Sequence, residues 1–417
     1  MNKVKEFIQS REFVKYFLMF FSGTLLAQIV TIAISPILTR IYTPEDFGIY
    51  GVYLSIVSLL IVFATGRYEF AINSVKTEED AVSIYKIVNY LTVFVSGFLL
   101  IVILMSGETI VRLLNLQIDP RLLIFVPFTI LVLGFLQSST YYLNRHKKFE
   151  VLSKSKIYQS IANAVSSLSA GFMSFGALGL VLANVVSVFS SQLYQRLRGV
   201  RSLKVETTRE QLIANLKKHK DYPLYNAPSA FFDTLALQAP VLILVRFFSE
   251  SIVGFYSLTV RVLGLPLTLI STSISQVFLS QVSELNREGK SYRGVIVKVA
   301  KYLALIGIFP LLGLMLLAPS LFSLVFGSEW RLAGEYAQIL MIGYYFKFVI
   351  SPLSMVFFIN QKIRLLSVIQ TIRAFSTVLT LLVLSSYFEV QTVLIGYTIH
   401  ECLFYVVYFY NILRTSN

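Results

Sequence analysis

Long apolar segments separated by short charged or turn-forming stretches recur along the whole chain. Each segment approaches or exceeds the roughly 20 residues that an α-helix needs to cross the hydrocarbon core of a bilayer. This pattern predicts an all-α integral membrane protein with twelve transmembrane helices. The predicted spans are approximately 13–38, 47–70, 87–105, 121–144, 157–175, 177–195, 223–246, 252–282, 295–318, 334–359, 366–386 and 392–413.

The composition favours the same interpretation. Of the 417 residues, 56% are hydrophobic and only 14% are charged, and the mean hydropathy is +0.71. Soluble domains carry roughly 25% charged residues because their surfaces face water. These values exclude a soluble globular enzyme and a disordered chain. Because Cys402 is the only cysteine, the chain can form neither an intrachain disulfide nor a cysteine zinc cluster.

Lysine and arginine are concentrated in alternate loops. Only four of these 36 residues fall in predicted outer loops, namely Arg40, Arg112, Arg121 and Arg331. Because short basic loops stay on the cytoplasmic side during insertion, both termini are expected in the cytoplasm. This asymmetry accounts for the net charge of +14 without nucleic acid. The first apolar segment is too long for a secretory signal peptide, so we expect it to remain in the membrane.

A basic stretch divides the predicted helices into two groups of six. We expect an N-terminal lobe at 1–200, a cytoplasmic linker at 201–222 and a C-terminal lobe at 223–417. A weak repeat supports this division, because Phe-Gly-Ile-Tyr at 47–50 corresponds to Val-Gly-Phe-Tyr at 253–256. Transporters with parallel repeats bind substrate near the membrane midplane between their halves. The sequence therefore predicts two pseudo-symmetric lobes around a central cavity.

Among the ionisable residues inside or at the ends of the predicted spans, five cations and three acids are candidates for a functional role. Each charge at the bilayer centre costs on the order of 3 kcal/mol, so each is a candidate functional residue. Cations predominate, which favours an anionic substrate, and the arginine fork is well suited to phosphate. The cations are Arg67, Arg246, Arg261, Lys347 and Arg373, and the acids are Glu69, Asp233 and Glu401.

The depth of each charge leaves alternatives open. Arg67, Arg246 and Arg373 lie where long side chains can extend to the interface, so they have a structural interpretation. Arg261 and Lys347 are deeper and are expected to face a wet cavity or an acid. The acids are either structural partners of these cations or proton-coupling sites with raised pKa values.

Enzymatic chemistry has no support in the sequence. The chain contains no metal-ligand spacing, no glycine-rich phosphate loop and no nucleophile elbow. Its predicted loops are too short for a catalytic domain. We therefore expect a protein that is not an enzyme and that needs neither cofactor nor bound metal.

Several segments carry a resemblance to a known family. They resemble bacterial polysaccharide flippases of the O-antigen (Wzx-like) type, within the multidrug/oligosaccharidyl-lipid/polysaccharide exporter superfamily. The first hairpin is the most specific part, and the C-terminal spans match mainly in hydropathy. The segments are Gly-Thr-Leu-Leu-Ala-Gln at 23–28, Pro-Ile-Leu-Thr-Arg-Ile-Tyr-Thr-Pro-Glu-Asp-Phe-Gly at 36–48, Ala-Thr-Gly-Arg-Tyr-Glu-Phe-Ala at 64–71, Gly-Phe-Tyr-Ser-Leu at 254–258, Arg-Val-Leu-Gly-Leu-Pro at 261–266 and Gln-Val-Phe at 276–278.

The resemblance implies a flippase in the bacterial inner membrane. Its substrate would be an undecaprenyl-diphosphate-linked oligosaccharide, an O-antigen or capsule repeat unit, moved from the cytoplasmic to the periplasmic leaflet. By analogy Arg67 and Arg261 are the first choices for cavity residues, followed by Lys347 and Arg373. Gly66 stands before Arg67 where a bulkier apolar residue is expected. This difference makes the direction of the Arg67 side chain less certain than the family pattern implies. A coupling ion, H⁺ or Na⁺, and a polysaccharide polymerase are expected partners.

Three rival interpretations remain. A cation-coupled drug exporter of the same superfamily would share the fold, and Asp233 and Glu401 suit it. Peptidoglycan-precursor flippases of this superfamily generally have fourteen helices, which the predicted count disfavours. A membrane polysaccharide polymerase or glycosyltransferase would need a sizeable outer loop with an acidic site.

Overall fold

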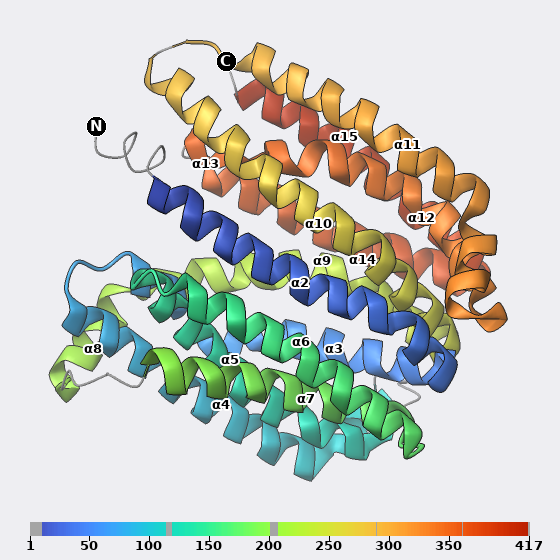
Figure 1. The fold of residues 1–417 in the computed structure, drawn as a ribbon, viewed down its shortest axis with the longest axis horizontal. Helices are drawn as coiled ribbons and strands as arrows, with labels where there is room; N and C mark the ends of the chain where they lie inside the picture. Colours follow the sequence, from blue (N-terminus) through green and yellow to red (C-terminus); the bar gives the residue numbers. More distant parts are fainter. Residues whose placement is uncertain (1–10, 114–118, 201–206, 289, 361, 416–417) are drawn as a thin grey trace. The chain divides into compact units, whose positions relative to one another are not determined.

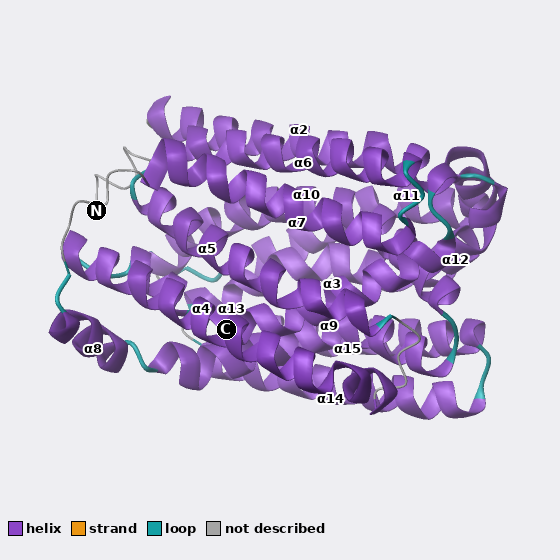
Figure 2. Cartoon of the chain, turned by 90° about the horizontal axis from the view of Figure 1, so that it is seen from below, coloured by secondary structure: helices purple, strands orange, loops and turns teal. Residues whose placement is uncertain are grey.

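A computed structural model describes residues 11–113, 119–200, 207–288, 290–360 and 362–415. The chain divides into two compact units, Met1–Phe231 and Phe232–Asn417. The drawn residues form helices joined by short loops (Figure 2). The division between the units falls inside a helix, after the predicted linker at 201–222, of which 201–206 lie outside the described residues. The predicted lobe boundaries stay a prediction.

The first unit is built from long helices that run side by side (Figure 1). Helix α6 packs between α2 and α7, while α5 packs against α3, α4 and α7. Short α8 packs against α4. The elements are α2 Arg11–Ile41, α3 Pro44–Thr65, η1 Tyr68–Asn73, α4 Glu78–Leu113, η2 Pro120–Ile124, α5 Phe125–Arg145, α6 Phe149–Phe172, α7 Gly176–Gln195, η3 Arg196–Val200, α8 Arg209–Lys218 and η4 Tyr222–Asn226.

The second unit is centred on α12, which packs against α10, α11 and α15. Helix α14 packs against α15, and a short 3₁₀ turn and helix follow α12. The elements are α9 Ala227–Phe247, whose first residues belong to the first unit, α10 Glu250–Arg287, α11 Arg293–Phe326, η5 Ser328–Trp330, α12 Arg331–Ile350, η6 Ser351–Ser354, α13 Met355–Ile359, α14 Ile363–Tyr387 and α15 Val390–Thr415.

Ten segments in the described part of the chain are long and apolar enough to cross a membrane. They coincide with ten of the twelve predicted spans. The other two predictions fall on α6 and α10, which are helical but are not among the ten. Helix α6 contains Lys154, Lys156 and many serines, which lower its hydropathy. The chain is thus a multi-pass membrane protein, and its helices satisfy the backbone polar groups internally, as lipid requires.

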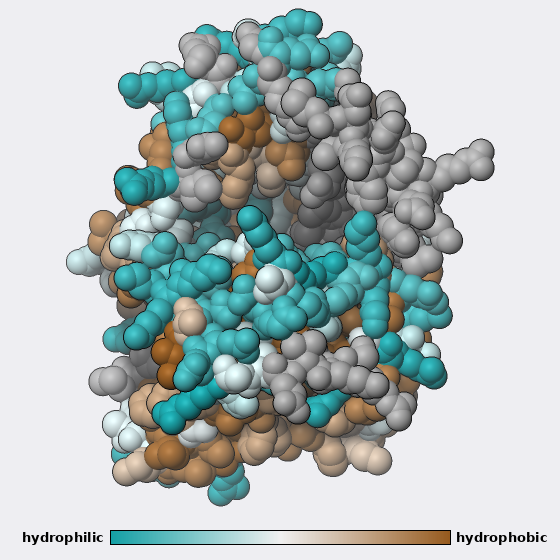
Figure 3. Space-filling model, turned by 90° about the vertical axis from the view of Figure 1, so that its left-hand side faces the viewer, coloured by the Kyte–Doolittle hydropathy of each residue, from teal (hydrophilic) through white to brown (hydrophobic). Residues whose placement is uncertain are grey.

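The side-chain distribution suits a lipid environment. Large apolar side chains on α4 and α11 are exposed, for example Phe94 at 72% and Leu316 at 77%. At the end of the first unit that carries α8, hydrophilic side chains gather instead (Figure 3). An apolar belt with a polar end is the arrangement expected when lipid surrounds the belt and water the end.

Local capping fixes where the helices begin and end. The Thr43 hydroxyl accepts a hydrogen bond from the Asp46 backbone N–H, and the Asp46 carboxylate accepts one from the Thr43 N–H. This capping box, with Pro44 in the first turn, starts α3. Gly66 ends α3 at φ 56°, a left-handed conformation that glycine adopts at little cost.

One arginine organises the loop that follows. The Arg145 guanidinium, at the end of α5, donates hydrogen bonds to the backbone carbonyls of Ile72, Val75, Lys76 and Thr77. It also lies 3.5 Å from a carboxylate oxygen of Glu78, at the start of α4. The Thr77 carbonyl also accepts a hydrogen bond from the Ala81 backbone N–H, in the first turn of α4. Arg145 thus supplies donors to the carbonyls of the loop between η1 and α4.

We predict that Gly334→Ala destabilises the second unit, whereas Gly313→Ala does not. A Cβ atom at Gly334 would lie 2.5 Å from the Pro319 Cα and 2.6 Å from the Ala318 carbonyl oxygen, so α11 and α12 would have to separate. Overpacking of this kind costs about 1–3 kcal/mol. A Cβ at Gly313 meets nothing within 4 Å, and Gly313→Ala should raise stability slightly because alanine favours helix.

The measurement is the midpoint of thermal unfolding of each purified variant in the same detergent. Equal midpoints for the two alanine variants would contradict the close approach of α11 and α12.

Candidate functional site

A buried ion pair joins the last two helices of the second unit. Arg373 of α14 and Glu401 of α15 form two hydrogen bonds, from Nε to Oε1 at 3.2 Å and from Nη2 to Oε2 at 2.6 Å. The two residues are only 4% and 6% exposed. The guanidinium also lies over the rings of Phe404 and Tyr405, at 4.8 and 5.5 Å. This bidentate geometry holds the Arg373 side chain in one orientation.

A cavity of about 220 Å³, which we call the charged cavity, lies beside this pair. Its charged lining residues are Arg373, Lys347 of α12 and Asp233 of α9. The side-chain oxygen of Gln370 also belongs to it and is buried without a hydrogen-bond partner among the described residues. The full lining is Asp233, Leu237, Lys347, Ser351, Ser354, Gln370, Arg373, Phe404, Tyr405 and Tyr408.

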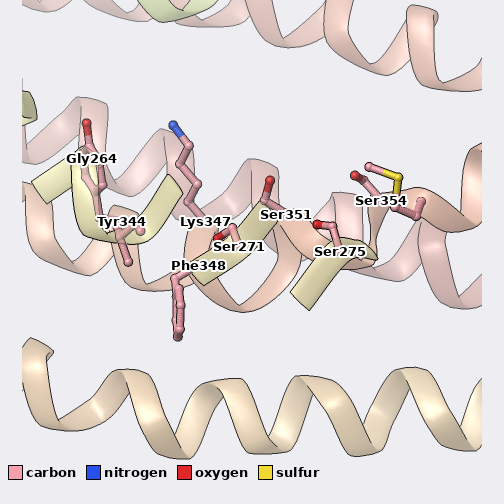
Figure 4. Close-up of a pocket in the computed structure, with 10 residues that line it drawn as sticks. Gly264, Ser271, Ser275, Tyr344, Lys347, Phe348, Ser351 and Ser354 are labelled. Atoms are coloured by element: carbon pink, nitrogen blue, oxygen red, sulfur yellow. The ribbon is translucent and has the colours of Figure 1, made fainter. Parts of the chain in front are cut away.

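A second cavity of about 270 Å³ shares Lys347, Ser351 and Ser354 with the first. We call it the serine-lined cavity, because α10 adds Ser271 and Ser275. Figure 4 shows the Lys347 amine and the neighbouring Phe348 ring pointing to opposite sides of α12. The other lining residues are Gly264, Leu267, Tyr344, Phe348 and Met355.

Lys347 connects the two cavities. Its Nζ lies 5.4 Å from the centre of the Tyr344 ring. Within the described residues it forms no hydrogen bond and no ion pair. Glu401 is already engaged by both hydrogen bonds from Arg373. Among the described lining residues, the arrangement therefore offers a polar molecule an ammonium group, several hydroxyls and the Asp233 carboxylate, for which no hydrogen bond is found.

The structure brings together four of the eight predicted residues, namely Asp233, Lys347, Arg373 and Glu401. Arg246 lies exposed in the last turn of α9, and Arg261 lies on α10 one turn before Gly264. Neither lines the two cavities described above. The role of each residue in binding stays a prediction.

Arg67 and Glu69 form a separate pair in the first unit, around η1. The Arg67 backbone is left-handed, with φ 60°, and its Nε donates to the Asn226 side-chain oxygen at 3.2 Å. Its guanidinium also lies 4.6 Å from the centre of the Phe70 ring and 4.0 Å from Glu69. Glu69 is 1% exposed, and burial raises the pKa of its carboxyl group above the ordinary value of 4.5.

The uncharged polar residues were missed by sequence reasoning. Serine is common in transmembrane helices because its hydroxyl can bond to a carbonyl one turn back, so single serines carry no signal. The spacing of Ser271 and Ser275 could have predicted a polar face on this helix, because residues four apart lie on the same face. Gln370 is isolated in sequence.

Comparison with known proteins identifies the family. Residues 37–335 match the model of a family described as polysaccharide biosynthesis protein. The chain belongs to this family. The match includes Arg67, Asp233, Arg246 and Arg261 and ends before Lys347.

Two curated relatives are consistent with the family. A Klebsiella pneumoniae protein, described as an uncharacterized membrane protein in the cps region, is 21% identical over 334 residues, 79% of this chain and 67% of that protein. The teichuronic acid biosynthesis protein TuaB of Bacillus subtilis is 23% identical over 211 residues, 49% of this chain. That alignment spans 42% of TuaB, less than half of its length.

Solved structures show the fold. The lipid II flippase MurJ in an inward closed conformation has a TM-score of 0.72 at 15% identity, covering 96% of this chain and 87% of that one. An inward-facing multidrug resistance MATE family transporter of the MOP superfamily has a TM-score of 0.71 at 16% identity, covering 95% and 94%. The family model confirms the predicted resemblance to a polysaccharide family, and these structures show a shared fold.

We predict that Glu401→Gln strongly destabilises the protein, because it leaves the Arg373 cation buried without its partner. Removing one member of a buried pair costs about 3–5 kcal/mol, whereas replacing both members with apolar residues costs much less. The double variant Arg373→Met with Glu401→Leu should therefore unfold at a higher temperature than Glu401→Gln.

Glu150→Gln, which breaks an exposed pair with Lys154, is the control and should change little. A midpoint for Glu401→Gln no lower than that of Glu150→Gln would disprove the role of the pair.

We predict that Glu69→Gln changes how stability depends on pH. The folded protein holds the Glu69 proton more tightly than the unfolded chain, so wild-type stability falls as pH rises above about 4.5. Thermal midpoints of the variant and the wild type should be closest below about pH 4.5, and the variant should gain stability relative to the wild type as the pH rises. Glu210→Gln, at an exposed position on α8, serves as the control. A difference between Glu69→Gln and wild type that stays constant as the pH rises would refute the expectation.

Proposed function

We propose that this chain is a flippase that moves an undecaprenyl-diphosphate-linked oligosaccharide, an O-antigen or capsule repeat unit, between leaflets by alternating access. The observation that carries the proposal is Lys347, a cation that lines both the charged cavity and the serine-lined cavity. These cavities lie in a unit most of whose long helices are apolar enough to cross a membrane. Membership of a polysaccharide biosynthesis family supports the sugar, and the fold shared with MurJ supports a lipid carrier.

The charge pattern supports an anionic headgroup. An ammonium group in a low-dielectric site interacts strongly with a phosphate, because water does not screen the pair. Arg373 is held by Glu401, so Lys347 is the cation available for the diphosphate. Asp233 lines the same cavity and balances the Lys347 charge when no substrate is bound. The unpartnered Gln370 oxygen and the serine hydroxyls suit sugar hydroxyls.

The proposed topology has twelve spans in two pseudo-symmetric six-helix lobes, with both termini in the cytoplasm of a bacterial inner membrane. Helices α6 and α10 supply the two spans beyond the ten candidates, since both are long enough to cross a bilayer. Outward movement of the diphosphate then follows the inside-negative potential, which contributes about 2.3 kcal/mol per charge per 100 mV.

Coupling and partners complete the proposal. Asp233 and Glu69 are carboxylates to which H⁺ or Na⁺ could bind, and a polysaccharide polymerase would receive the product. Arg67, Arg246 and Arg261 are proposed to contribute to substrate binding at other stages of transport. A cation-coupled drug exporter is the second candidate, favoured by Asp233 in the charged cavity and by the shared MATE fold.

We predict that Lys347→Gln reduces transport by about tenfold or more, because a lost hydrogen bond to a charged group costs about 1.5–3 kcal/mol. Lys347→Arg keeps a cation and should retain more transport. Lys301→Gln, at an exposed position on α11, is the matched control and should transport normally. The assay restores each variant to a host strain that lacks the gene and measures lipid-linked oligosaccharide on each membrane face.

In the deletion strain, intact lipid-linked units should accumulate on the cytoplasmic face. Units that are missing, shortened or already outside would overturn the proposed function. Normal transport by Lys347→Gln would remove this residue from the mechanism.

A further inference from the structure

A third cavity in the second unit is almost entirely apolar. It has a volume of about 170 Å³ and lies between α10, α11 and α12. We call it the apolar cavity. Its lining residues are Val262, Leu263, Leu267, Ile270, Ile306, Gly307, Pro310, Leu314, Met341, Tyr345 and Phe348. Apolar cavities of about this size stay free of water and bind small apolar molecules.

The apolar cavity adjoins the serine-lined cavity. The two share Leu267 of α10 and Phe348 of α12 as a common wall. Phe348 is the next residue after Lys347 and points away from the Lys347 amine (Figure 4). The apolar cavity and the ammonium group therefore lie on different sides of α12. The three cavities therefore form a series, from apolar through hydroxyl-lined to charged, with Lys347 common to the last two.

The apolar cavity reaches the surface of the protein between α10 and α11. Ile270 of α10 and Ile306 of α11 line it and are still 44% and 56% exposed. Helices α10 and α11 both pack against α12, which forms the floor between them. Gly307 allows α11 to lie close to α12 here, because a Cβ atom at this position would lie only 3.0 Å from the Phe348 ring. Pro310 has no N–H to donate to the Ile306 carbonyl, which favours a bend of α11 at this opening.

We propose that the apolar cavity binds the isoprenoid segment next to the diphosphate of the lipid carrier, which enters sideways between α10 and α11. This inference rests on the proposed function and specifies where the carrier's tail is held. The diphosphate would then reach the serine-lined cavity and Lys347 while the rest of the chain stays in the bilayer. The transfer of apolar chain from lipid into this cavity needs no exposure to water, so it costs little.

The dimensions favour an isoprenoid over a membrane phospholipid. A polyprenyl carrier has a single branched chain attached directly to its phosphate. A diacyl phospholipid has two chains joined through glycerol, and both would have to enter the same narrow opening. The adjoining ammonium group selects an anionic head, and a cavity of about 170 Å³ accepts only a short piece of one chain.

The test uses the full chain in nanodiscs of neutral phosphatidylcholine and a farnesyl diphosphate that carries a terminal benzophenone. Irradiation followed by peptide mass spectrometry should place the crosslink on α10 or α11, beside Ile270 or Ile306. Unlabelled farnesyl diphosphate should compete, and phosphatidylglycerol should not. Equal competition by phosphatidylglycerol would show an ordinary phospholipid groove and overturn the inference.

Two matched variants locate the opening. Ile306→Trp places a large ring across it and should reduce crosslinking by about tenfold. Leu305→Trp, on the same helix at 62% exposure, lies outside the lining and should crosslink like wild type. Because both side chains are already exposed, neither substitution should prevent folding. Equal crosslinking in the two variants would overturn the inference.

The outcome for the proposed function is read separately. If wild type and Ile306→Trp move lipid-linked oligosaccharide equally well, the tail is held elsewhere while the flippase proposal stands. If wild type labels as expected and moves no lipid-linked oligosaccharide, the cavity binds isoprenoids but the proposed function fails.

Discussion

Every charge inside the second unit has to be met by another polar group, because the surrounding solvent is hydrocarbon. Arg373 and Glu401 satisfy this requirement completely, with two hydrogen bonds and two aromatic rings around one guanidinium. The pair fixes α14 against α15 and leaves Lys347 without a carboxylate hydrogen bond. The binding properties of the cavities follow from this unequal distribution. Arg373 has a hydrogen-bonded carboxylate partner, and Lys347 has none among the described residues.

The two units place their charged groups differently. In the first unit, Arg145 and the pair of Arg67 with Glu69 lie in and around the loop between α3 and α4, at its polar end. In the second unit, Asp233, Lys347, Arg373 and Glu401 lie within the helices. A charge that organises a loop acts mainly by satisfying backbone carbonyls, whereas a charge inside a helix bundle also creates an affinity for ions or headgroups.

The sequence predicts helices far better than it predicts partners. Long apolar runs allow few structures in lipid, so ten predicted spans coincide with membrane-length helices. Hydropathy also singled out Lys347 and Arg373, because charges stand out against an apolar background. It could not predict that Arg373 meets Glu401, since this contact depends on how α14 packs on α15. Arg67 was expected near the end of a span, but Gly66 ends α3 first and places Arg67 in a turn.

The adjacency of Lys347 and Phe348 restricts how this part of the chain can change in evolution. Successive helical residues are rotated by about 100°, so one inserted or deleted residue moves every later side chain to another face. Gly334 fixes the start of α12 by its close approach to α11. A relative with a different number of residues between Gly334 and Lys347 would turn the ammonium group away from its cavities. Insertions are therefore expected in the loops of this family and not within this stretch of α12.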